Sequence, residues 1–144
     1  MKLGLRDFLE ELQDHIANES DLDLTVSENF TIGNLLDLQD IDTYLSSEIE
    51  LTMFEEGGGL RRSGRRHHQE RTVRFLYKGD YGQQAVNRCL ALIEWLSNNS
   101  LSFQTSNFRA WMARTDKLPS VIAAAQTGTH LADCVVTFLV FKRG

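Results

Sequence analysis

The sequence predicts an α+β protein in which two main helices pack on one face of a mostly antiparallel sheet of four to five strands. Apolar residues recur at helical spacing in 3–19 and 80–97, which indicates two amphipathic helices. Apolar and polar residues alternate in 48–55 and 71–78, which indicates two half-buried strands. Because no linker or internal repeat divides the chain, we expect a single domain over 1–144.

The two predicted helices each present one apolar stripe to the sheet. The second helix is expected to begin at Asp80, a residue type that caps helix N-termini, with Gln83 as its capping-box partner. It should end near Ser97. The stripe of the first helix is Leu5, Phe8, Leu9, Leu12 and Ile16, and that of the second is Tyr81, Ala85, Cys89, Leu92, Ile93 and Leu96.

The two alternating segments are expected to pair as an antiparallel hairpin, with 57–70 as its long tip. Ahead of them, 30–32 is predicted to be a short strand that Gly33 and Asn34 end. The acidic stretch 35–44 is predicted to be a loop or a short helical turn.

The C-terminal part predicts two further strands. One lies around 106–114, and Pro119 is expected to start a loop that also contains Gly128. The last strand, 133–141, is apolar on both faces, which is typical of a strand inside a sheet. The helices would cover one of its faces, and a neighbouring subunit could cover the other.

Charge divides the chain at residue 57. Residues 1–56 hold fifteen Asp or Glu and two Lys or Arg, whereas residues 57–144 hold five acids and thirteen bases. The net charge of −5 therefore hides a strong asymmetry. Opposite potentials on two surfaces can steer a head-to-tail contact between copies of one chain, so the pattern favours self-association.

No motif indicates catalysis, so we expect neither an enzyme nor a bound metal or cofactor. The glycine-rich run 57–64 lacks the Gly-Lys-Ser/Thr ending of a phosphate-binding loop and precedes a predicted strand. His67 and His68 are adjacent and would point to opposite faces of a strand. Cys89 and Cys134 fall on predicted core positions, where thiols are reduced and inert. No apolar run has membrane-spanning length.

The arginines of the tip and its border are the strongest candidates for an interaction site. A basic cluster can contact nucleic-acid phosphates, but no aromatic residue lies within the tip to stack on bases. An acidic protein surface is therefore the preferred partner. A nucleic-acid-binding module and a solvated loop without a partner are the alternatives. The arginines are Arg61, Arg62, Arg65, Arg66 and Arg71.

Six segments follow one another in an order that is typical of one protein family. They are 30–35 (Phe-Thr-Ile-Gly-Asn-Leu), 51–58 (Leu-Thr-Met-Phe-Glu-Glu-Gly-Gly), 71–79 (Arg-Thr-Val-Arg-Phe-Leu-Tyr-Lys-Gly), 81–96, 118–119 (Leu-Pro) and 134–138 (Cys-Val-Val-Thr-Phe). In this order they resemble the minor capsid and tail-terminator (tail-completion) proteins of tailed bacteriophages. The resemblance extends over about three quarters of the chain.

The resemblance implies a structural protein of the virion neck with an α+β fold. Proteins of this family form a ring, usually a hexamer, that caps the tail tube, ends its polymerisation and provides the head-joining surface. The implied partners are further copies of the chain, the tail tube protein, the head–tail connector proteins and, transiently, genomic DNA in the channel. The implied localisation is the virion neck, and the host cytoplasm during assembly. Another connector, head-completion or minor capsid subunit is the closest alternative.

A ring of this kind needs a contact between unlike surfaces of neighbouring copies. We expect the basic tip 61–71 of one protomer to reach an acidic surface on the next protomer or on the tail tube. The candidate acids are Asp37, Asp40, Asp42, Glu48 and Glu50.

Overall fold

The computed structural model describes residues 5–33, 40–56, 61–62, 68–99, 108–126 and 128–142. Within these residues, three helices and a mixed, mostly antiparallel sheet form the predicted α+β fold. The sheet has the order β1-β2-β4-β6-β5, with β3 paired to β4 beside this path, and β1 runs parallel to β2. The elements are α1 (Leu5–Glu19), β1 (Phe30–Ile32), α2 (Ile41–Ser46), β2 (Leu51–Glu55), β3 (Arg61–Arg62), β4 (His68–Gly79), α3 (Gly82–Asn98), β5 (Phe108–Ala124) and β6 (His130–Lys142).

The helices α1 and α3 contribute to one apolar core on the same face of the sheet, which confirms the predicted packing. Their stripes completely bury Phe8, Leu12 and Leu92, together with inward-facing residues of β4 and β6. The ring of Phe8 meets Phe138 of β6 edge-on, with 5.9 Å between the ring centres. Because burial of one such side chain contributes about 1.5–3 kcal/mol, this face supplies most of the hydrophobic stabilisation.

The predicted hairpin is confirmed, since β2 pairs antiparallel with β4. The expected tip over 57–70 is partly wrong, because β4 already begins at His68 and β3 pairs with it. β4 extends this far because β6 pairs with all twelve of its residues. Positions 57–60 and 63–67 of the predicted tip lie outside the described residues.

The start of α3 differs from the prediction. The N-cap residue is Tyr81 and not Asp80, and its side chain makes no capping bond. Gln84 takes the role expected of Gln83, because its Oε1 accepts a 2.5 Å hydrogen bond from the backbone N–H of Asp80. As the residue before the first helical turn, Tyr81 is 57 % exposed, so its predicted burial is also wrong.

The last two strands are longer than predicted, and Pro119 lies within β5. The prediction that Pro119 starts a loop is therefore wrong. Proline is tolerated there because β5 is the edge of the sheet and pairs with β6 through several register shifts, one of them spanning 117–120. β6 lies between β4 and β5 and is buried throughout 131–138, which confirms its predicted inner position.

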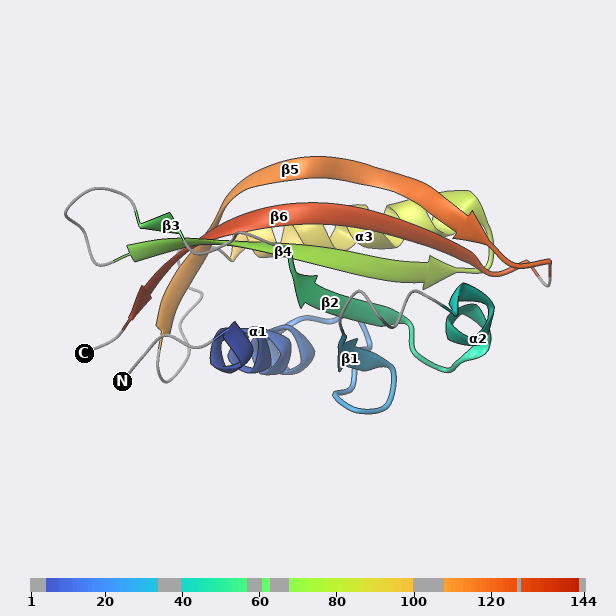
Figure 1. Cartoon of the computed structure of the whole chain (residues 1–144), viewed down its shortest axis with the longest axis horizontal. Coiled ribbons are helices and arrows are strands. Elements are labelled where there is room, and N and C mark those ends of the chain that lie inside the picture. Colours follow the sequence, from blue (N-terminus) through green and yellow to red (C-terminus); the bar gives the residue numbers. More distant parts are fainter. Residues whose placement is uncertain are drawn as a thin grey trace.

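The face of β4, β6 and β5 that points away from α1 and α3 is here called the open face. Among the described residues, α2 is the helix that packs on it, at one end of the sheet (Figure 1). Leu45 of α2 forms a small second core there with Phe54, Leu76 and Leu131. The prediction of a loop or short helical turn over 35–44 is confirmed in its described part by α2.

Candidate interaction surfaces

Arg71, predicted to belong to an exposed interaction site, is completely buried. Its Nε and Nη2 atoms lie 2.8 and 2.6 Å from Oε1 of Glu55, and its guanidinium lies 4.9 Å from the ring centre of Phe8. Burial raises the pKa of Glu55, and the charge of the arginine opposes this rise. Arg71 faces the helices because it alternates in step with Val73 and Phe75 along β4. Its assignment to an exposed surface is therefore wrong.

The described tip arginines and α2 mark opposite ends of the sheet (Figure 1). Arg61 and Arg62 form β3 beside the first residues of β4, whereas Arg65 and Arg66 lie outside the described residues. The other end of β4 reaches α2, where Lys78 contacts it. The twelve residues of β4 correspond to about 40 Å of extended chain, so the sheet holds the two ends apart.

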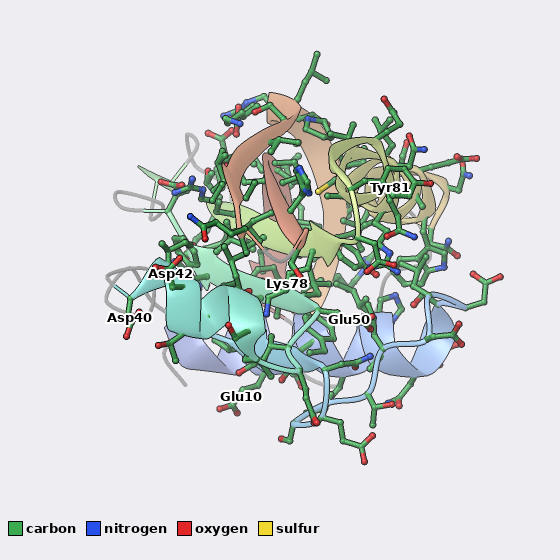
Figure 2. The ribbon with its side chains drawn as sticks, turned by 90° about the vertical axis from the view of Figure 1, so that its right-hand side faces the viewer. Glu10, Asp40, Asp42, Glu50, Lys78 and Tyr81 are labelled. Atoms are coloured by element: carbon green, nitrogen blue, oxygen red, sulfur yellow. The ribbon has the colours of Figure 1, made fainter. Side chains whose placement is uncertain are left out.

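The predicted acids that the structure describes gather at the α2 end, which faces the viewer in Figure 2. Asp42 and Glu48 are exposed. Glu50 is half-buried, and its Oε2 accepts a hydrogen bond of 2.7 Å from Nδ2 of Asn29. Asp37 lies outside the described residues. The structure thus brings four of the five predicted acids to one end of the sheet, because Asp40 lies at the N-terminus of α2 beside Asp42.

Two side chains hold α2 in place. At its N-terminus the carboxylate of Asp40 accepts hydrogen bonds from the backbone N–H and the hydroxyl of Thr43, at 3.2 and 2.7 Å, which lower the pKa of Asp40. At its C-terminus the ammonium group of Lys78 donates to the carbonyls of Tyr44 and Ser47 and lies 4.4 Å from the ring centre of Tyr44. Burial lowers the pKa of Lys78 to about 8. The acidic end therefore has a defined position on the sheet.

A network of ion pairs and hydrogen bonds crosses the middle of the open face. Asp133 of β6 is completely buried and pairs with Nη2 of Arg74 at 2.6 Å and with Nζ of Lys117 at 2.5 Å. Nearby, the hydroxyl of Thr137 donates to Asp116. The network joins β4, β6 and β5. Sequence reasoning missed it because Asp133 opens an apolar strand and its partners are distant in the chain.

Three half-buried apolar side chains lie on the open face between this network and the β3 end. Trp111 and Phe141 stack with 5.0 Å between their ring centres, and Leu139 is the cross-strand partner of Trp111. These three residues are called the aromatic platform. Exposed Arg109 is the cross-strand partner of Phe141, and exposed Arg114 lies farther along β5. Sequence reasoning also missed the platform, because strand pairing brings its members together.

The edge strand β5 exposes further apolar side chains near the start of α3. Leu118 is 74 % exposed, and Val121 and Ile122 are each exposed by about two fifths. A Cβ on Gly82 of α3 would lie 3.3 Å from Val121, so Val121 lies beside the residue that follows the exposed Tyr81 in the chain. The register shifts make the free edge of β5 irregular. An irregular edge disfavours the addition of another strand.

The described residues contain no group of three or more His, Cys, Asp or Glu that could hold a metal ion. Cys89 and Cys134 are free and buried, and the hydrogen bond between them, together with burial, raises the pKa of the Cys134 thiol. Cys134 is therefore a packed side chain and a poor nucleophile. No helix in the described part of the chain is long and apolar enough to cross a membrane.

Comparison of the chain with protein-family models gives no match, and neither does comparison with curated proteins. What the fold and its surfaces define is a small α+β domain with arginines at one end of a long sheet and carboxylates at the other. Residue chemistry and geometry are thus the basis of the functional argument.

Proposed function

We propose that the protein is a structural subunit of a phage virion neck that forms a ring on the tail tube, ends tube polymerisation and provides the head-joining surface. The observation that carries this proposal is the separation of charge along the sheet. Arg61 and Arg62 lie at the β3 end, and Asp42 and Glu48 lie at the α2 end. The order of the sequence motifs resembles that of tail-terminator proteins, and this resemblance is the reason for proposing a ring on the tail tube.

Subunits with unlike ends associate head to tail, and such a contact closes into a ring when its rotation fits a full turn. About 40 Å of strand separates the two ends, so the described arginines of β3 cannot neutralise the acids at α2 of the same copy. The basic end of one copy therefore meets the acidic end of the next copy or an acidic surface of the tail tube. A contact of this kind weakens as salt increases.

Negative-stain electron microscopy of the purified full chain at low salt tests the proposal. Rings with six-fold symmetry are expected. The double substitution Arg65→Glu with Arg66→Glu should reduce the number of rings, most strongly at low salt, where the charges are least screened. Arg65→Lys with Arg66→Lys preserves the charge and serves as the control that should still assemble.

Two results would contradict the proposal. If the charge-reversal variant assembles normally and phage carrying it are infectious, the tip has no role in assembly. If the wild-type chain stays monomeric and binds duplex DNA with a steep salt dependence, the protein is a nucleic-acid-binding module.

A further inference from the structure

The charge contact proposed above specifies no apolar anchor, and the aromatic platform of Trp111, Leu139 and Phe141 offers one. All three side chains are half-buried, so part of each faces away from the protein's own core. Their backbone positions alternate with Ala110 and Val140, which are completely buried beneath the helices. Tryptophan and arginine are enriched among the residues that dominate binding energy in protein interfaces. A stacked Trp–Phe pair beside an exposed arginine therefore has the composition of a binding anchor.

The helix α2 of the same copy cannot cover this platform. Leu131 of β6 packs under α2, whereas Phe141 of the same strand belongs to the platform. Ten residues of β6 separate them, which corresponds to about 33 Å of extended chain. A helix of six residues, held at both of its ends, does not span that distance.

The rim of the platform selects for an acidic partner. Arg109 is exposed and lies opposite Phe141. The carboxylate of Glu70, the cross-strand partner of Leu139, is paired with Arg114 at 2.7 Å, so Arg109 sets the charge of the rim. An apolar centre with a basic rim fits a surface that offers carboxylates around an apolar side chain.

The α2 end of a second copy offers this chemistry. Asp42 and Glu48 are exposed there, and Ile41 and Tyr44 are only partly buried against the second core. Asp40 and Lys78 hold α2 at its two ends, so the surface is ordered before binding and little conformational entropy is lost on contact.

We infer that the aromatic platform of one copy seats the α2 end of a second copy. The contact joins unlike surfaces, so it repeats from copy to copy. It rests on the proposed function, in which it is the joint between neighbours in the ring, with Arg109 facing the acids at α2.

A single-tryptophan variant reports on the platform directly. The chain has two tryptophans, and Trp95→Phe leaves Trp111 as the only one while it keeps an aromatic ring beside His15. As protein concentration rises at low salt, the emission of Trp111 should shift to the blue in parallel with the association measured by sedimentation velocity. Dilution or added salt should reverse both signals.

Matched charge variants test the partner surface. Asp42→Lys with Glu48→Lys should weaken association about tenfold or more. Asp14→Lys with Glu94→Lys changes the net charge equally at exposed sites on α1 and α3 and should leave association within about twofold of wild type. Arg109→Glu should weaken association like the first pair. Mixing Arg109→Glu with Asp42→Lys/Glu48→Lys places opposite charges at both contacts between unlike copies, so the mixture should associate more strongly than either variant alone.

Several outcomes would overturn the inference. Equal weakening by the two acid pairs would show a general charge effect, and complexes that form without a change in Trp111 emission would place the contact elsewhere. An oligothymidylate that shifts the Trp111 emission of monomeric protein would identify single-stranded nucleic acid as the occupant.

Electron microscopy separates this inference from the proposed function. Rings that form while Trp111 emission stays constant would overturn the platform contact and support the ring. The opposite result is short head-to-tail complexes without closed rings, weakened by Asp42→Lys with Glu48→Lys but not by Asp14→Lys with Glu94→Lys. This result would support the platform contact and contradict the ring.

Discussion

Successive side chains of β4 and β6 point to opposite faces of the sheet, and the two faces differ in the residues they contain. On the helix-covered face, Val136 and Phe138 are completely buried in the apolar core. On the open face, Asp133 and Thr137 are equally buried but belong to a network of charges and hydroxyls. Apolar burial is strong and has no preferred direction, whereas ion pairs are directional and contribute little net energy. The difference teaches that apolar burial on one face stabilises the fold, whereas directional ion pairs on the other hold charged side chains in fixed positions.

The largest effect should come from Phe138 and its neighbour Leu139, which point to opposite faces. Phe138→Ala removes a fully buried ring and should lower the free energy of unfolding by about 4 kcal/mol. Leu139→Ala on the open face should lower it by only about 1 kcal/mol. Urea unfolding of the two variants measures both values. Equal losses would mean that the two faces contribute alike.

A smaller effect is expected within the open-face network. Asp133→Asn removes the buried charge that pairs with Arg74 and Lys117 and should cost about 2 kcal/mol. Asp116→Asn changes a more exposed partner of the same network and should cost less than about 1 kcal/mol. Chemical denaturation gives the comparison. Should both substitutions be silent, the network has no role in ordering this face.

Loosening the attachment of α2 to the sheet should lower the free energy of unfolding by less still. Lys78→Met removes the ammonium group that donates to Tyr44 and Ser47 but also the cost of burying a charge, so the loss should be about 1 kcal/mol. The amides of α2 should exchange faster with solvent while those of β4 keep their protection. Lys117→Met is the control, because Lys117 is paired elsewhere on the open face. Unchanged exchange of α2 in Lys78→Met would show that other contacts hold it.

The smallest effect concerns pH and the helix-covered face. Burial lowers the pKa of His15, whose ring lies 5.3 Å from Trp95, below its unfolded value of 6.5. The unfolded chain then takes up the proton first, so this contribution to stability is present above pH 6.5 and is lost as pH falls through the folded pKa. His15→Phe should flatten the decline in stability between neutral pH and about pH 5. An identical decline in the variant would assign it to other groups.

Local sequence patterns correctly predicted the helices and strands in which the spacing of apolar residues along the chain decides which side chains are buried. The stripes of α1 and α3 and the alternation of β2 and β4 match the observed core, because side-chain periodicity alone decides which residues share a face. The predictions for Pro119, Tyr81 and Arg71 were wrong for a different reason. An edge position, an N-cap and a buried ion pair each depend on a neighbour that local periodicity does not specify.

The sequence by itself determined the α+β class, the two amphipathic helices, the hairpin and the inner position of β6, because period and composition act over a few neighbouring residues. Only the tertiary structure decided that Arg61 and Asp42 lie at opposite ends of the sheet and that Trp111 stacks on Phe141. These placements follow from the register of β4, β5 and β6, which pairs residues far apart in the chain. Such register is set by the packing of the whole core, and no local pattern contains it.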